Sequence, residues 1–129
     1  MRHIGRGDVG GLKLGDGQDA STQLGPLANP RRVTAAQEYV DDALAVGAQL
    51  VLGGKIAEGA GFFYPATVLT DVPENARVMN EEPFGPVALI HQVSTMEDAI
   101  AEANRLPFGL AAYLFTENAR TANLMADAV

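Results

Sequence analysis

The amino-acid sequence predicts an α/β protein whose sheet is mostly parallel and is flanked by helices. Two apolar runs in the second half of the chain, residues 86–93 (PVALIHQV) and 110–115 (LAAYLF), read as strands, and an amphipathic helical pattern follows each of them. This succession of strand, helix, strand and helix implies a parallel βαβ unit with a right-handed crossover. A chain of 129 residues suits one such domain and can bury a core of its own.

The first half of the chain predicts one helix and two short strands. The leading segment is rich in glycine and has little periodicity, which is typical of loops. Asn29 can cap a helix, Pro30 suits its first turn, and Gly47 is placed to end it. The apolar face of this helix is formed by Val33, Ala36, Val40 and Leu44. Residues 49–54 (QLVLGG) and 63–70 (FYPATVLT) then read as a strand with a glycine turn and its returning strand.

The second half predicts two further helices, one after each strand. The strand at residues 86–93 shows little alternation, as expected if both of its faces are covered. Ser94 and Glu97 form an S-x-x-E capping box for the first of these helices, and Thr116 can cap the second. Their apolar stripes are Met96, Ala99, Ile100 and Ala103, and Ala119, Ala122, Met125 and Val129. The last helix runs to the final residue without a cap or a closing strand, so we expect an incomplete α/β layer.

Composition and charge argue against several classes of function. The formal net charge is −7, with nine basic residues and no cluster of them, and an acidic chain repels nucleic-acid phosphates. We therefore expect no nucleic-acid partner. There is no cysteine, which removes disulfides, thiolate zinc sites and a cysteine nucleophile from this polypeptide. No run approaches the ~20 apolar residues that span a bilayer, so we expect a cytoplasmic protein without a membrane partner.

Two short motifs near the start of the chain partly match the sequences of ligand-binding loops but lack the neighbouring elements or ligands that such loops need. Residues 5–10 (GRGDVG) match G-x-G-x-x-G, but no strand precedes them and no helical pattern follows, so a flexible leader is the better interpretation. Residues 15–19 (GDGQD) lack the remaining ligands of a calcium loop. His3 and His91 are isolated from other potential ligands, and we expect no metal site.

The most distinctive stretch is residues 78–90, VMNEEPFGPVALI. Glu81 and Glu82 directly precede a turn in which two prolines fix φ and Gly85 permits tight backbone geometry. On one interpretation the glutamates are solvated and Phe84 belongs to the core. On the other, the turn lies at the carboxyl-side crevice of the sheet, where one carboxylate binds the paired hydroxyls of a ribose and the ring packs against a flat heterocycle. Such a site would hold a nucleotide and would supply no nucleophile.

Residues 80–90 (NEEPFGPVALI) resemble the glutamate–phenylalanine signature of the NAD(P)-dependent aldehyde dehydrogenase superfamily. Further segments resemble successive parts of that family in the same order, namely LGPL, GAQLVLGG, GFFYPATVL and EANRLPFGLAAYLFT. The resemblance covers residues 12–129, whereas residues 1–11 depart from the family and read as a leader. It implies that the fold is part of an aldehyde dehydrogenase catalytic domain. EEPFGPVA together with FGLAAYLFT is most similar to the succinate-semialdehyde dehydrogenase branch.

The resemblance implies roles for the residues of the turn. Glu82 corresponds to the carboxylate that family members use on the nicotinamide ribose hydroxyls, and Phe84 to the ring beside the nicotinamide. Pro83 stands where many relatives have an aliphatic residue. Glu81 reads as a turn or salt-bridge residue. The cofactor implied for the complete enzyme is NAD or NADP, and the substrate is a small aldehyde such as succinic semialdehyde.

The family's reaction needs groups that this chain does not have. A thiolate attacks the aldehyde, hydride passes to NAD(P)+, and an activated water releases the carboxylic acid. Since the chain has no cysteine, we expect no catalytic residue in it and no dehydrogenase activity from it alone. The resemblance implies that the remainder of the enzyme, or another subunit, supplies the missing groups and that the complete enzyme is a homo-oligomer.

An alternative function is that of a non-catalytic module that binds a nucleotide or docks onto another subunit. On either interpretation the apolar runs at residues 86–93 and 110–115 should expose hydrophobic surface. We therefore expect the isolated chain to self-associate, or to be partly molten, unless a partner covers these runs.

Overall fold

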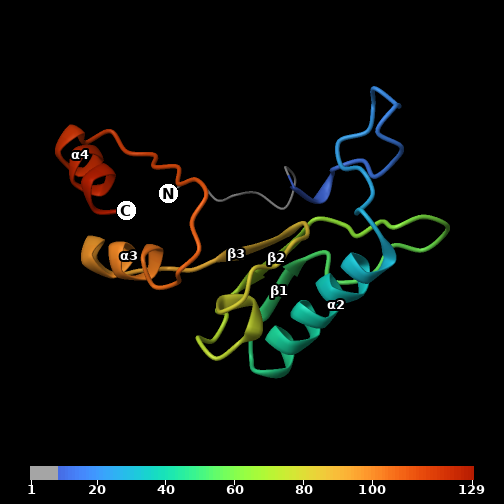
Figure 1. Ribbon diagram of the computed structural model, residues 1–129, viewed down its shortest axis with the longest axis horizontal. Helices are drawn as coiled ribbons and strands as arrows, with labels where there is room; N and C mark the ends of the chain where they lie inside the picture. The colour runs from blue at the N-terminus through green and yellow to red at the C-terminus, as the bar shows by residue number, and fades with distance from the viewer. Residues whose placement is uncertain (1–8) are drawn as a thin grey trace. The chain divides into compact units, whose positions relative to one another are not determined.

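The computed structural model describes residues 9–129, and the chain divides into two compact units between His91 and Gln92 (Figure 1). The described part of the first unit includes one long helix, a three-stranded sheet and a single turn of 3-10 helix. The second unit contains two helices and the segment that connects them. The α/β class predicted from the sequence is confirmed. No helix in the described part of the chain is long and apolar enough to cross a membrane.

The long helix of the first unit, α2 (Pro30–Ala45), begins and ends where the sequence predicts. The Asn29 side chain accepts a hydrogen bond from the backbone N–H of Arg32 at 3.2 Å, which satisfies one free donor of the first turn. After the helix, Gly47 has a φ of +113°, a conformation that side chains with a Cβ rarely adopt. The buried face consists of Val33, Ala36, Val40 and Ala43. Leu44 was expected on this face and is instead 36% exposed, because Ala43 takes the inward position.

The sheet contains β1 (Gln49–Leu52), β2 (Thr67–Thr70) and β3 (Val87–Ile90), in that spatial order. β1 and β2 are antiparallel, as expected for a strand and its return, and β2 and β3 are parallel. The sheet is therefore mixed, and the expectation of a mostly parallel sheet is wrong. No helical crossover joins the parallel pair. The chain returns from β2 to β3 through the 3-10 helix η1 (Arg77–Met79) and the turn that follows it.

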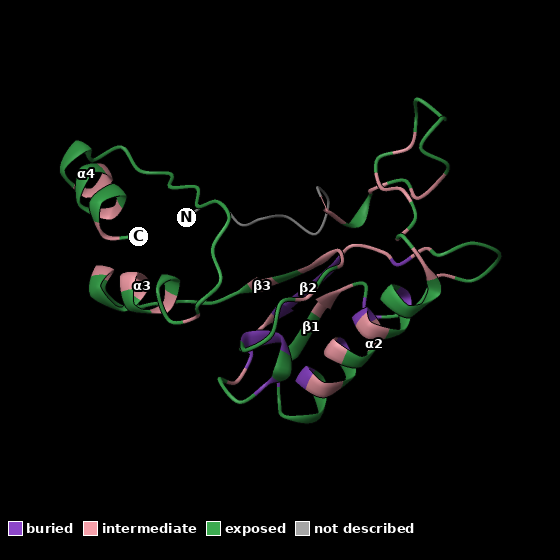
Figure 2. Ribbon diagram, viewed as in Figure 1, coloured by how far each residue is buried: buried purple, intermediate pink, exposed green. Residues whose placement is uncertain are grey.

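The core of the first unit forms between α2, β2 and the segment that includes η1 (Figure 2). Its fully buried members include Tyr64 and Leu69, and burial raises the pKa of the Tyr64 hydroxyl to about 12. Thr67 is also buried, and its hydroxyl accepts from Gly54 N at 2.9 Å and donates to Pro65 O at 3.0 Å. The core residues are Val33, Ala36, Val40, Ala43, Ala48, Tyr64, Leu69, Val72, Ala76, Val78 and Met79. Along β3, Val87 and Leu89 pack against this cluster while the alternate residues are exposed, so only one face of β3 is covered and the expectation of two covered faces is wrong.

The second unit contains α3 (Met96–Ala103) and α4 (Ala119–Ala128), and both begin slightly later than predicted. Thr95, rather than Ser94, caps α3, and it exchanges hydrogen bonds with Asp98 at 3.1 and 3.2 Å. Both neighbouring pairs have capping-box spacing, so the sequence alone does not distinguish them. Asn118, rather than Thr116, caps α4, since its side chain accepts from two backbone N–H groups of the first turn.

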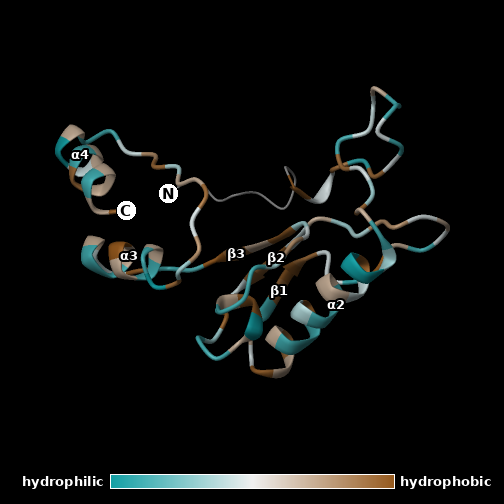
Figure 3. Ribbon diagram, viewed as in Figure 1, coloured by the Kyte–Doolittle hydropathy of each residue, from teal (hydrophilic) through white to brown (hydrophobic). Residues whose placement is uncertain are grey.

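The predicted strand at residues 110–115 is not a strand in the structure. It is an irregular connection between α3 and α4, and hydrophobic residues lie along it (Figure 3). The exposed fractions are 103% for Leu110, 84% for Tyr113 and 92% for Phe115. A strand needs a neighbour to complete its hydrogen bonds, and no strand within residues 9–129 pairs with this segment. The expected βαβ unit is therefore not present among the described residues.

Candidate functional site

The candidate site is the turn at residues 81–86, which joins η1 to β3. Short backbone hydrogen bonds fold it tightly, from Gly85 N to Pro83 O at 3.1 Å and from Val87 N to Gly85 O at 2.9 Å. Thr67 N donates to Pro86 O at 2.8 Å, which fastens the end of the turn to β2. Because β2 and β3 are parallel and β3 follows the turn, the site lies at the amino ends of this pair. The expectation of a carboxyl-side crevice is therefore wrong.

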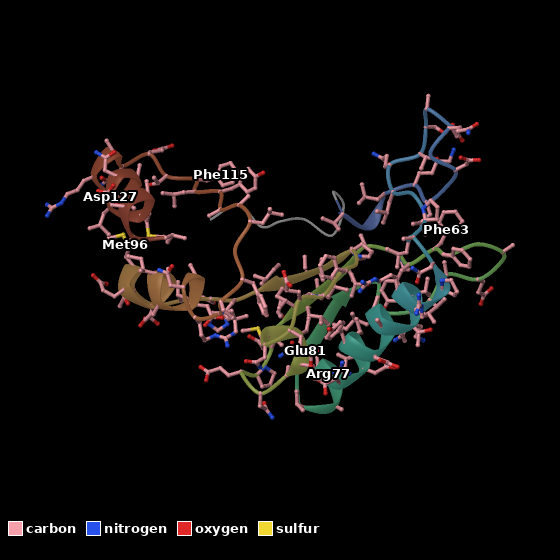
Figure 4. All side chains as sticks on the ribbon, in the orientation of Figure 1. Phe63, Arg77, Glu81, Met96, Phe115 and Asp127 are labelled. Carbon is pink, nitrogen blue, oxygen red and sulfur yellow. The ribbon has the colours of Figure 1, made fainter. Side chains whose placement is uncertain are left out.

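Glu81 is held in place by side chains from two other elements. Arg77 of η1 donates to both carboxylate oxygens, from Nε at 3.0 Å and from Nη2 at 3.2 Å, and Tyr39 of α2 donates its hydroxyl at 2.9 Å. Figure 4 shows Arg77 and Glu81 next to each other. The hydrogen bonds from Arg77 and Tyr39 lower the pKa of Glu81. Glu81 is a salt-bridge residue, as the sequence analysis expected.

The pKa values of the two partners of Glu81 are raised, whereas that of Glu81 is lowered. Hydrogen bonding and proximity to the Glu81 carboxylate raise the pKa of Arg77. Partial burial, followed by the hydrogen bond to Glu81, raises the pKa of the Tyr39 hydroxyl. All three groups therefore keep their paired protonation states at neutral pH: an ionised carboxylate, a guanidinium cation and a neutral phenol.

Glu82 differs from its neighbour in having no partner among residues 9–129. Its side chain is exposed, and within residues 9–129 its carboxylate takes part in no hydrogen bond or ion pair. Two adjacent residues of the same type thus have different environments. The carboxylate of Glu81 is occupied with protein donors, and that of Glu82 is free to accept hydrogen bonds from a ligand.

Phe84 lies outside the core, so the interpretation that made it a core residue is wrong. Its side chain is 62% exposed. The guanidinium carbon of Arg32 on α2 lies 4.9 Å from the ring centroid, within the range of a cation–π contact. The structure therefore presents an aromatic ring at the surface with a cation on one side, two residues beyond a free carboxylate.

The aspartates of residues 15–19 and His91 do not form a site among the described residues. Asp19 accepts hydrogen bonds from Ser21 and Lys13, and Asp16 accepts one from Gln18 N, so both organise their own loop. Within the described residues no three His, Cys, Asp or Glu side chains come together as a metal site would require. His91 is exposed just beyond β3. His3, Gly5 and Gly7 lie outside the described residues.

Three residues that contact the turn were not identified from the sequence: Arg32, Tyr39 and Arg77. Arg77 precedes Glu81 by four residues, and that spacing is a recognised ion-pair signal. Nothing in the sequence indicates that Tyr39 and Glu81, which are 42 positions apart, are hydrogen-bonded. Arg32 is likewise brought to Phe84 only by the packing of α2. The resulting arrangement presents an exposed aromatic ring beside a carboxylate that has no partner among the described residues, and it contains no cysteine.

Comparison with known proteins shows which family this chain resembles in sequence. Residues 7–129 match the model of the aldehyde dehydrogenase family. A succinate-semialdehyde dehydrogenase [NADP(+)] of Escherichia coli is 44% identical over 110 residues, which are 85% of this chain and 23% of that protein. A 4-(hydroxymethyl)benzenesulfonate dehydrogenase of Comamonas testosteroni is 46% identical over 109 residues, which are 84% of this chain and 22% of that protein.

Solved structures give the same result. A succinate-semialdehyde dehydrogenase from Burkholderia pseudomallei has a TM-score of 0.88 and 38% identity, and the match covers 95% of this chain and 26% of that one. A 3,6-anhydro-L-galactose dehydrogenase, solved as a complex, has a TM-score of 0.88 at 32% identity, with 95% of this chain and 26% of that one covered. The chain spans less than a quarter of the length of the curated relatives described above, at 23% and 22%.

Proposed function

The chain belongs to the aldehyde dehydrogenase family, and from this premise we propose that it supplies the nicotinamide-ribose-binding turn of an enzyme that oxidises an aldehyde to a carboxylic acid with NAD+ or NADP+. The observation that carries the proposal is the contrast within the turn. Glu81 is tied to Arg77 and Tyr39, whereas the adjacent Glu82 carboxylate is unpaired within the described residues and stands close in sequence to an exposed ring.

Glu82 is proposed to bind the two hydroxyls of the nicotinamide ribose. An ionised carboxylate has two acceptor oxygens, and hydrogen bonds to a charged acceptor are shorter and stronger than those between neutral groups. The backbone around it is restricted, because Pro83 fixes its own φ and disfavours the α conformation of Glu82. Little conformational freedom is then lost on binding, which favours affinity.

Phe84 is proposed to pack against the nicotinamide ring. The exposed 62% of its side chain leaves much of the ring available to a flat heterocycle, and offset or edge-to-face aromatic contacts are favourable. The coenzyme, when bound, would accept the hydride removed from the aldehyde carbon. The part of this chain is to orient the acceptor for that transfer, since correct orientation supplies much of the rate enhancement of a two-reactant step.

The remaining catalytic groups are proposed to come from outside this chain. The sequence contains no cysteine, so no thiolate nucleophile is present in it. We propose that the remainder of the enzyme or another subunit contributes the nucleophile, and that the purified chain alone does not oxidise aldehydes. Succinic semialdehyde is the proposed substrate, because relatives in Escherichia coli and Burkholderia pseudomallei are named for it.

The exposed segment of the second unit supports a partner of this kind. Leu110, Tyr113 and Phe115 together offer an apolar surface of the sort that marks contact sites. Within a homo-oligomeric enzyme we propose that other parts of the enzyme cover them. The same observation favours a second candidate, a non-catalytic module that docks onto another subunit, and self-association of the isolated chain is expected on either proposal.

A titration of the purified chain with NADH and NADPH, followed by coenzyme fluorescence, tests the main proposal. We expect saturable binding that weakens about ten-fold in Glu82→Gln, the size of one lost charge-assisted hydrogen bond. Glu38→Gln removes the same charge from the exposed side of α2 and should leave binding unchanged. Equal effects of the two variants would mean that Glu82 does not bind the coenzyme. Aldehyde-dependent NADH formation by the purified chain would contradict its proposed inactivity.

A further inference from the structure

The helix α2 carries two side chains that contact the turn, and both lie on one stripe of the helix. Arg32 contacts the ring of Phe84, and Tyr39 contacts the carboxylate of Glu81. Residues seven apart lie on the same face of a helix, separated by about 10.5 Å along its axis. Glu81 and Phe84 are three positions apart in the turn. The two contacts therefore fasten both ends of the segment from Glu81 to Phe84 to one face of α2.

The turn also approaches α2 between these two contacts. A Cβ placed on Gly85 would lie 3.4 Å from the Cβ of Ala36, which stands between Arg32 and Tyr39 on the same side of the helix. The close approach means that the turn lies directly against α2. Glu82 makes no contact with the helix among the hydrogen bonds and ion pairs of the described residues, and its side chain is exposed.

A third element closes the network around Glu81. The Arg77 guanidinium carbon lies 5.0 Å from the centroid of the Tyr39 ring, and the Arg77 backbone N–H donates to the Asp42 carboxylate at 2.7 Å. Tyr39 and Asp42 both belong to α2, so η1 is fastened to the same helix that contacts the turn. Each partner of Glu81 is thus itself held in place, as a preorganised site requires.

We propose that Arg32 and Tyr39 are positioning residues for the coenzyme turn, and that α2 fixes the turn in its binding arrangement before the coenzyme arrives. Tyr39 and Arg77 donate their hydrogen bonds to Glu81, and this leaves the adjacent Glu82 carboxylate available to the coenzyme. Arg32 holds the ring of Phe84 at the other end of the turn. The identity of the ligand rests on the proposed function, whereas the order of the turn does not.

Nuclear magnetic resonance of the ligand-free chain tests the positioning directly. In Tyr39→Phe and in Arg32→Met, we expect faster backbone motion of Glu82 to Phe84 and changed chemical shifts of the Phe84 ring protons. The pKa of Glu81 should also rise toward its ordinary value in Tyr39→Phe, because the hydrogen bond from the Tyr39 hydroxyl lowers it. Arg32→Lys keeps the cation and should restore part of the ring shift. Arg31→Met is the matched control and should change none of these signals.

Coenzyme titration separates this proposal from the one on which it rests. We expect Tyr39→Phe and Arg32→Met to weaken coenzyme binding by about three- to ten-fold through lost preorganisation. If Glu82→Gln weakens binding while both positioning variants leave the affinity and the turn dynamics unchanged, the positioning inference is wrong. If Glu82→Gln has no effect, the proposed function fails, and the dynamics of the ligand-free turn alone decide the positioning. Unchanged dynamics in both variants overturn it in every case.

Discussion

The two units of the chain contain similar helices and differ in what those helices bury. Helices α2, α3 and α4 each have an N-cap side chain and an amphipathic pattern. Every buried residue of the described chain nevertheless lies between Val33 and Met79, in the first unit, and α3 and α4 bury none. Capping and periodicity are local and suffice to form a helix. A core also requires a second layer, and only α2 has a sheet to pack against.

This difference bears on the candidate site. The turn at residues 81–86 is fastened to α2, η1 and β2, all of which belong to the unit with a core. The exposed apolar segment belongs to the unit without one. We infer that the part of the chain proposed to bind the coenzyme is ordered by its own packing, whereas the second unit depends on a surface that covers it.

The largest expected effect comes from a truncation in the core of the first unit. Leu69 is fully buried in β2, and Leu69→Ala should lower the free energy of unfolding of that unit by about 2–5 kcal/mol. Leu124 of α4 is 41% exposed, and Leu124→Ala should change the free energy of unfolding of the first unit by no more than about 0.5 kcal/mol. Urea denaturation followed by far-ultraviolet circular dichroism measures both. Equal losses would show that the second unit contributes to the same core.

An intermediate effect is expected from the helix caps, which are chemically alike in the two units. Asn29→Ala removes the N-cap of α2 and should destabilise the first unit by about 1 kcal/mol. Asn118→Ala removes the N-cap of α4 and should reduce only local helicity, because α4 buries no residue. Residue-specific amide hydrogen exchange distinguishes the two outcomes. Faster amide exchange throughout the first unit in Asn118→Ala would contradict the independence of the units.

The smallest effect is a pH dependence confined to the turn. Because hydrogen bonds from Arg77 and Tyr39 lower the pKa of Glu81, its stabilising contribution is complete above the ordinary pKa of a glutamate and is lost as the pH falls through the lowered value. Asp42 is the other carboxylate joined to this network. Carbon-13 titration of Glu81, with the amide signals of the turn, should show loosening below that pH. A Glu81 pKa at or above its ordinary value would contradict the network.

In the second unit, acid should have no comparable tertiary effect. Its Glu102–Arg105 ion pair joins residues three positions apart in sequence. Breaking that pair does not release one element from another. An acid transition of equal size in the second unit would therefore contradict the expected difference in pH dependence between the two units.

The parts of the fold that depend on neighbours in sequence were predicted well. Asn29, Pro30 and Gly47 mark the ends of α2, and the two glycines after β1 have the positive φ that ends the strand. The predicted strand at residues 110–115 failed for the opposite reason. An apolar run has strand propensity, but its hydrogen bonds must come from another strand, and the described chain provides none.

The candidate site was also predicted only in part from the sequence. The residues of the turn were identified from the sequence, and Glu81 was correctly expected to form a salt bridge. Its partner Tyr39, and the contact between Arg32 and Phe84, depend on how α2 packs against the turn. Such contacts between distant segments leave no pattern in a single sequence, so only the structure reveals them.

The two contacts between α2 and the turn have a consequence for how this gene can change. Inserting or deleting one codon between Arg32 and Tyr39 would rotate one side chain relative to the other by about 100° and shift it by about 1.5 Å. Both contacts with the turn could not then form together. Point substitutions on the exposed side of the helix carry no such penalty. We expect the length of this helical segment to be more constrained in evolution, and in engineered variants, than most of the residues it contains.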